Sequence, residues 1–279
     1  MRTLTLSISL GLMMSSFAFA EVAGPSLEQL KGTVRLNNCS ASLVALEGYQ
    51  PSDSAMIMTN GHCLGQGSVM GHYPGPGEVL YHTRSVHTRG SLYTGNTEQP
   101  TYTLNIRELL YGTMTDTDLG IYLAKETYQE IKEKTTVEPF IFAKDTRKTL
   151  ALGSHIRMTS SYWKNSDVCT YEKTVDVLKE GKWTFGPSLR LTSECLVRHG
   201  SSGSPLILEG TSIIVGIVNT MYEGGPLCEE DNPCEVGPHG ELSHGGISQA
   251  YGQFVDGIYT CVNANRELDL TVPGCILPK

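Results

Sequence analysis

The sequence predicts an all-β protein folded into two β-barrels. Its 279 residues include 30 Gly and 13 Pro, which separate many short apolar segments, and few long helical patterns occur. Short apolar runs bounded by turn residues are typical of strands. They form two successive sets, each about 100 residues long, and this arrangement favours two barrels over one sandwich.

The first set of expected strands follows a lead-in of weak pattern, residues 21–31. The strands are expected at residues 33–36, 42–46, 55–59, 78–86, 102–106 and 119–123. Asn60-Gly61 ends the apolar run before it, and Gly and Pro residues between 65 and 77 mark a loop.

The second set follows a polar segment that tolerates a helix, residues 125–135. Its strands are expected at residues 150–159, 167–177, 189–192, 205–208 and 213–218. Residues 222–246, rich in Gly, Pro and acids, are expected to form a loop. The predicted organisation is therefore an N-terminal barrel half with its lead-in at 21–135 and a C-terminal barrel half with a tail at 136–279.

The first twenty residues read as a signal peptide. Arg2 supplies a positive start, residues 4–17 are mostly apolar, and Ala18-Phe19-Ala20 is a small-x-small cleavage signal. The alternative is a short membrane anchor, but a spanning helix needs about 20 apolar residues. We expect a secreted or periplasmic protein that begins near Glu21 and has no membrane contact after cleavage.

The charge balance excludes one large class of partners. The full chain carries a net charge of −8, and removal of the signal peptide would take away one basic residue and no acid. No basic patch stands out, so nucleic acid and anionic membranes are not expected partners. The oligomeric state cannot be read from the sequence, and a monomer is favoured.

Three segments carry residues suited to nucleophilic catalysis. An apolar strand ends at His62 beside Cys63, and Asp118 stands where a polar loop enters an apolar strand. Gly200-Ser201-Ser202-Gly203 combines a hydroxyl with small neighbours, which permits a tight turn with backbone N–H groups facing outward. Each segment alone is equally compatible with a structural histidine, a turn aspartate or a surface loop.

Together the three segments resemble the motifs of the chymotrypsin/trypsin-like serine peptidases. Thr59–Cys63 resembles T-A-A-H-C, Cys39–Val44 resembles C-x-G-S-L-I, Asp118–Leu123 resembles D-I-A-L-L, Gly200–Leu206 resembles G-D-S-G-G-P-L, and Gly216–Val218 resembles G-I-V. The order His, Asp, Ser is that of this family. The form Gly-Ser-Ser-Gly-Ser-Pro is similar to bacterial members, in particular the glutamyl-endopeptidase branch.

The resemblance implies a fold and a reaction. It implies two antiparallel six-stranded β-barrels with the active site in the cleft between them, and a serine endopeptidase that acts on proteins or peptides. Ser202 would form the acyl-enzyme, His62 would act as base and acid, and Asp118 would orient His62. The N–H groups of Gly200 and Ser202 would form the oxyanion hole. No metal or cofactor is expected.

The resemblance also implies a specificity pocket. It places Leu196 at the floor, Val197 beside it and His199 near the rim, with a facing strand of Val218, Asn219, Thr220 and Met221. No acid at the floor argues against a preference for Arg or Lys, and Val218 stands where the glutamyl-endopeptidase branch has a histidine. A medium apolar side chain is therefore expected. The acids Glu229-Glu230-Asp231 could attract a basic residue, although a solvated loop is the simpler interpretation.

The sequence departs from the family at the activation switch. Ser201 stands where animal enzymes carry the aspartate that pairs with a new N-terminus, and no I-V-G-G-like start follows Glu21. We therefore expect an oxyanion loop that is shaped without that ion pair. Arg198 stands where many members have a cysteine, so the disulfide beside the pocket is expected to be missing.

Eight cysteines behind a secretion signal indicate disulfides, although spacing alone leaves many connectivities open. Cys39 lies in the segment before His62-Cys63, and a bridge there would hold His62. Positions along the chain favour Cys39–Cys63, Cys169–Cys195, Cys228–Cys234 and Cys261–Cys275.

Three alternatives remain open. Cys228, Cys234, His239 and His244 could bind zinc, although their spacing is irregular. An α/β-hydrolase would also use Ser202, but its G-x-S-x-G elbow is broken at Ser204. A catalytically inactive secreted binding protein on the same fold is the third alternative.

Overall fold

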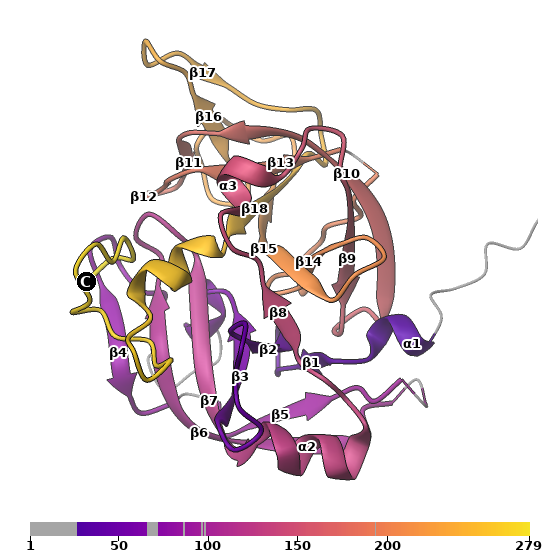
Figure 1. Ribbon diagram of the computed structural model, residues 1–279. Helices are drawn as coiled ribbons and strands as arrows, with labels where there is room; N and C mark the ends of the chain where they lie inside the picture. Colours follow the sequence, from indigo (N-terminus) through magenta and orange to yellow (C-terminus); the bar gives the residue numbers. More distant parts are fainter. Residues whose placement is uncertain (1–26, 66–71, 86, 96, 98, 193) are drawn as a thin grey trace, which may run out of the picture.

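The computed structural model describes residues 27–65, 72–85, 87–95, 97, 99–192 and 194–279, and the signal peptide expected at 1–20 lies outside them. The described chain is mostly β-structure (Figure 1). The strands are β1 (Thr33–Arg35), β2 (Ser40–Ala45), β3 (Ser54–Thr59), β4 (Val79–Thr83), β5 (Arg89–Leu92), β6 (Tyr102–Thr113), β7 (Leu119–Thr127), β8 (Phe140–Phe142), β9 (His155–Ser160), β10 (Asn165–Val175), β11 (Leu178–Glu180), β12 (Trp183–Phe185), β13 (Ser188–Leu191), β14 (Pro205–Leu208), β15 (Ile213–Met221), β16 (Cys234–Val236), β17 (Leu242–Ser243) and β18 (Ala250–Phe254). The helices are α1 (Leu27–Leu30), α2 (Tyr128–Thr135) and α3 (Thr146–Thr149), with 3₁₀ turns η1 (His62–Leu64) and η2 (Asp256–Cys261).

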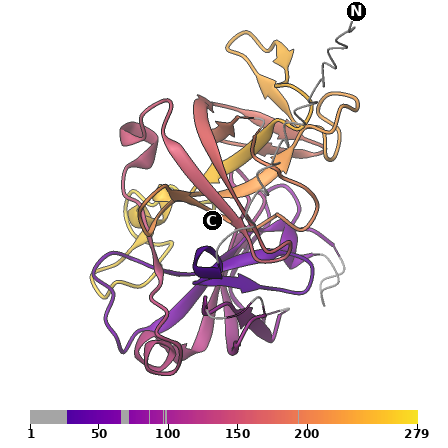
Figure 2. The ribbon, with the colours of Figure 1, turned by 90° about the vertical axis from the view of Figure 1, so that its right-hand side faces the viewer.

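Two rings of antiparallel strands close on themselves, as the sequence predicts. The first runs β1-β5-β6-β7-β3-β2 and returns to β1, and β4 adds to it beside β6. The second runs β15-β14-β9-β10-β13-β18 and returns to β15. In Figure 1 the first ring lies below the second, and Figure 2 shows the same two bodies from the side. Closure leaves few free strand edges.

Alternating side chains build an apolar core inside each barrel and a further core between the barrels. Successive residues of a strand point to opposite faces. In β2, Leu43 packs inside the first barrel, while Val44 packs in a core shared between the barrels. In β14, Leu206 packs inside the second barrel and Ile207 enters the shared core. Because these strands are buried on both faces, they appear in the sequence as apolar runs and not as strict alternation of apolar and polar residues.

Strand β8 joins the two rings. It pairs in parallel with β2, where Val44 lies opposite Phe140, and with β15, where Ile213 lies opposite Ile141. The link follows α2, which begins with a capping box between Thr127 and Glu130. The polar segment at 125–135 thus contains a helix in the connection between the halves.

The C-terminal tail returns to the first barrel. The Tyr81 hydroxyl donates to the Leu268 carbonyl at 2.8 Å, and the Tyr111 hydroxyl donates to the Pro278 carbonyl at 3.3 Å. Leu268, Leu270 and Leu277 pack in the shared core. The tail therefore belongs by sequence to the second half and by contact to both.

Eight cysteines form four disulfides: Cys39–Cys63, Cys169–Cys195, Cys228–Cys234 and Cys261–Cys275. These are the pairs that the sequence favoured. The third pair removes the thiolates that a zinc site with His239 and His244 would need. No helix in the described part of the chain is long and apolar enough to cross a membrane.

Part of the loop expected at 222–246 has regular structure. Strands β16 and β17 belong to a separate four-stranded sheet in the order β12-β11-β16-β17. Sequence reasoning also missed β5, β8 and β18. All of these strands have five residues or fewer, and their partners are mostly distant in sequence.

Candidate active site

His62 and Asp118 form a tight pair at the edge of the first barrel. The His62 Nδ1 atom lies 2.6 Å from Asp118 Oδ2, and the backbone N–H of His62 donates to Oδ1 at 2.9 Å. The side chain of Asp118 is fully buried, whereas that of His62 is 16% exposed. Because a carboxylate can only accept, Nδ1 carries the proton of the neutral ring and Nε2 is left as the base.

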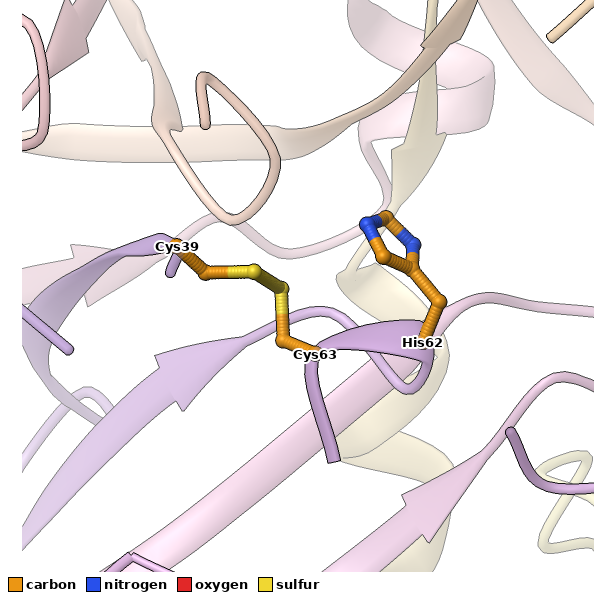
Figure 3. Close-up of side chains that lie close together, drawn as sticks. All are labelled: Cys39, His62 and Cys63. Atoms are coloured by element: carbon orange, nitrogen blue, oxygen red, sulfur yellow. A yellow bond between two sulfur atoms is a disulfide. The ribbon is translucent and has the colours of Figure 1, made fainter. Parts of the chain in front are cut away.

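The end of β3, a close contact at Gly61 and a disulfide hold the backbone around His62. Strand β3 ends at Thr59, and the chain turns through Gly61 into η1. A Cβ atom at Gly61 would lie 1.9 Å from the Thr113 carbonyl oxygen, so the close approach of this turn to the end of β6 requires glycine. The Cys39–Cys63 disulfide then ties η1 to the neighbouring segment, and Figure 3 shows His62 projecting beside it.

Asp118 immediately precedes β7, and its side chain is fully buried. The amide of Asn60 donates to the Asp118 carbonyl at 2.9 Å, which holds the backbone before the strand. Asp116, two residues earlier, is exposed with a φ of 54° in a turn. The two aspartates thus differ in environment, with Asp118 buried and Asp116 exposed in the turn.

Burial and charge act against each other on His62. Burial alone lowers the pKa of the imidazole, but the charge and hydrogen bond of Asp118 raise it, with smaller raising contributions from Glu180 and Asp231. The raising contributions together exceed burial, so the pKa of His62 lies above its ordinary value. The arrangement stabilises an imidazolium.

Ser202 lies on a turn that two glycines shape. Gly200 and Gly203 have φ values of 92° and 82°, a region that favours glycine. A Cβ at Gly203 would lie 2.0 Å from the Ser40 carbonyl oxygen, and the Ser40 N–H donates to the Ser202 carbonyl at 2.8 Å. The turn is thus held against the first barrel at β2.

Two backbone donors on this turn remain available. In the described part of the chain, the N–H groups of Gly200 and Ser202 donate to no protein acceptor. Ser201 between them is fully buried, and its hydroxyl accepts from the Arg198 N–H at 3.3 Å. The turn is therefore held by local hydrogen bonds, with no charge at position 201.

A cavity between the barrels brings His62, Gly200 and Ser202 together. Asp118 lies behind His62, away from the cavity lining. No hydrogen bond joins His62 to Ser202 among the described residues, and catalytic hydrogen bonds in unliganded enzymes often tighten only when substrate binds. The cavity supplies a place where a reacting group can meet both side chains.

The cavity lining includes some residues of the expected specificity pocket and not others. Val197, His199, Asn219, Thr220 and Met221 line the cavity. Leu196, expected at the floor, is 60% exposed on the surface, and Val218 is fully buried in the core of the second barrel. In β15, a register shift between Val218 and Thr220 accompanies this change of direction.

Sequence reasoning missed one wall of the cavity. Glu180 and Trp183 line it from β11 and β12, and Tyr73 and Met114 line it from the first barrel. Burial raises the pKa of Glu180 to about 7, against the lowering effect of its hydrogen bonds. The hairpin has a signal that could have been found, since Gly181 separates two short alternating runs.

The two closed barrels with a cavity between them define, at the level of fold, the chymotrypsin-like class. The similar solved structures include the MamO protease domain from Magnetospirillum magneticum, with a TM-score of 0.47 and 12% identity over 85% of this chain and 98% of that chain. A glutamic acid specific serine protease with a histidine triad in substrate binding has a TM-score of 0.43 and 13% identity over 80% and 91%. A scabies mite inactivated protease paralogue has a TM-score of 0.46 and 11% identity over 84% and 93%.

No family model and no curated protein sequence matches this chain.

Proposed function

We propose that the protein is an exported serine endopeptidase that hydrolyses peptide bonds through an acyl-enzyme on Ser202. The observation that carries the proposal is the buried Asp118 carboxylate 2.6 Å from His62 Nδ1, with the other side of the ring in a cavity shared with Ser202. A surface histidine would need no such partner, and burial of an unpaired carboxylate would be costly.

In the proposed reaction, the Ser202 hydroxyl attacks the scissile carbonyl carbon and gives its proton to His62 Nε2. The negative charge develops on the carbonyl oxygen, and the N–H groups of Gly200 and Ser202 would donate to it. The imidazolium, stabilised by Asp118, then protonates the leaving amine. Water repeats the sequence on the acyl-enzyme and releases Ser202.

The proposed enzyme needs no N-terminal activation ion pair. The position where that pair would form is occupied by buried Ser201, whose hydroxyl already accepts from the Arg198 N–H. A new N-terminus would find no buried carboxylate here. If removal of a propeptide before Gly32 proved essential for activity, this part of the proposal would be withdrawn.

Export belongs to the same proposal. Four disulfides persist in an oxidising compartment such as the periplasm or the extracellular space, and the apolar start of the sequence has the pattern of a secretion signal. The expected substrates are proteins or peptides.

A fluorophosphonate tests the proposal directly, because it reacts only with an activated serine. Treatment of the mature protein is expected to give one adduct, mapped by mass spectrometry to Ser202. Ser202→Ala is expected to abolish labelling and to lower kcat for a peptide on the order of 10⁶-fold. Ser212→Ala, which removes an exposed hydroxyl, is the matched control.

Absence of labelling in a folded sample, or an adduct elsewhere, would contradict the proposal. It would then favour a catalytically inactive secreted binding protein on the same fold.

A further inference from the structure

Glu180 is an acidic group in the cavity that the proposed reaction does not use. Its Oε1 atom accepts from the Thr220 hydroxyl at 3.0 Å and from the Asp231 N–H at 2.8 Å. The Oε2 atom accepts no hydrogen bond from the described residues. Glu180 lines the cavity together with His62 and Ser202, so the side chain that carries this oxygen belongs to the lining beside the proposed reaction centre.

Acidic side chains outnumber Lys and Arg side chains in the cavity lining. Four carboxylate side chains line it: Glu180, Glu223, Glu230 and Asp231. The Arg198 guanidinium lies 4.1 Å from the centre of the Trp163 ring. His199 Nε2 lies 3.2 Å from Glu223 Oε1, so this contact uses one of the four acids. In the part of the chain that the structure describes, Glu180 forms no ion pair with a Lys or Arg.

Apolar walls accompany the charge. Trp183 and Met114 are nearly buried and line the cavity. The Trp183 indole donates to the Pro74 carbonyl at 2.9 Å, and the ring contacts Tyr73 edge-on with centroids 5.8 Å apart, so the indole is held in place. Exposed Lys182 lies over the same indole, 4.9 Å from its centre. Aromatic and thioether groups suit the methylene stem of a long basic side chain, whose charged end needs an acid.

We infer that this cavity is a subsite for a basic side chain of the substrate, with the Glu180 carboxylate as its counter-ion. The inference rests on the proposed peptidase function and deepens it. It reverses the expectation of an apolar pocket, which followed from the absence of an acid at Leu196. The acid comes from β11 instead, a strand that the sequence analysis did not predict.

The first experiment uses the unaltered protein and substrates that differ in one charge. A peptide library is digested and cleavage sites are read by mass spectrometry. Lys and Arg are expected to be enriched at one fixed position near the cleaved bond. Synthetic peptides with Lys, Nε-acetyl-Lys or norleucine at that position separate charge from shape, and the Lys peptide is expected to have a kcat/KM about 10- to 100-fold higher.

The second experiment removes the counter-ion. Glu180→Gln keeps the size of the side chain and its ability to accept from Thr220. It is expected to lower kcat/KM for the Lys peptide by about 10- to 100-fold and to leave the norleucine peptide within about threefold. Both peptides are compared on the high-pH plateau of activity, where the effect of Glu180 on the pKa of His62 does not enter. Glu133→Gln, which changes an exposed carboxylate on α2, is the matched control. Equal losses on both peptides would assign Glu180 a structural role and overturn the inference.

A metal ion is the alternative occupant of this acidic cavity, because ligand atoms of His199, Glu223 and Asp231 lie within 4.8 Å of one another. Repetition of the peptide comparison with EDTA and with added Ca²⁺ separates the two cases. A Lys preference that is unchanged by EDTA supports the inference, and one that disappears overturns it.

Fluorophosphonate labelling without any basic preference refutes this inference alone, whereas absence of both labelling and cleavage refutes the proposed function and the inference together.

Discussion

At the scale of single residues, Asp118 decides how the imidazole of His62 can act. Its two carboxylate oxygens contact the ring and the backbone of the same residue. One therefore fixes the tautomer and the other fixes the turn. The sequence could single out both residues because they stand at strand ends in a familiar order. It could not single out Glu180, because the chemistry of that carboxylate depends on Thr220 and on the Asp231 N–H, 40 and 51 residues away.

Asp118→Asn is expected to lower kcat by about 10⁴-fold with little change in KM, because the amide can present N–H to Nδ1 and favour the wrong tautomer. The residual activity is also expected to show a lower pH midpoint. In the proposed mechanism catalysis needs neutral His62, so activity is expected to rise with pH through the pKa of His62, which the charge and hydrogen bond of Asp118 raise. The measurement is the pH profile of kcat and kcat/KM.

Asp116→Asn is the control for this prediction, since the exposed turn aspartate does not contact His62 and asparagine tolerates its positive φ. It is expected to leave both constants and the pH midpoint unchanged. Equal behaviour of the two variants would remove Asp118 from the proposed site.

At the scale of elements, strand type was predictable and strand partners were only partly so. Segments such as 55–59 and 205–208 are apolar runs ended by turn residues, and they became β3 and β14. Strand β8 has three residues, Phe140–Phe142, and its parallel partners come from two different barrels. Nothing local distinguishes such a segment from a loop. For the same reason the sequence analysis did not predict β11, whose partners include β16 more than fifty residues later.

The turn that carries His62 gives a prediction at this scale. Gly61→Ala would place a methyl group against the Thr113 carbonyl of β6. Because backbone must move, we expect a loss of about 1–3 kcal/mol in the free energy of unfolding. For a chain of this size the midpoint of thermal unfolding should fall by roughly 2–4 °C per kcal/mol. The displaced η1 should also lower kcat for every substrate tested.

Gly246→Ala is the matched control, because a Cβ there meets nothing within 4 Å and its φ is not positive. Calorimetry of both variants and the parent compares the midpoints. If Gly61→Ala unfolded at the same temperature as the parent, the close approach of the Gly61 turn to the Thr113 carbonyl would be wrong.

At the scale of the whole molecule, the C-terminal tail contacts both barrels. The sequence predicted two halves and a disulfide-tied tail. The packing of that tail on the first barrel could not be predicted, because it depends on where distant leucines meet. Leu268, Leu270 and Leu277 enter the core between the barrels. His62 and Ser202 share a cavity only while the two barrels keep a fixed orientation relative to each other. The tail packs against both barrels, and its residues do not line the cavity.

The Cys261–Cys275 disulfide closes this tail with a sequence separation of 14. Replacing both cysteines by serine is expected to reduce the free energy of unfolding by about 3 kcal/mol, since a loop of this length gains that much freedom in the unfolded chain. The thermal midpoint should fall, and limited proteolysis should cut the tail first. Because residues 256–279 do not line the cavity, kcat/KM at 25 °C should stay within about twofold of the parent. A large loss of activity in protein that remains folded would show instead that the tail sets the relation between the barrels, so that His62 and Ser202 depend on it directly.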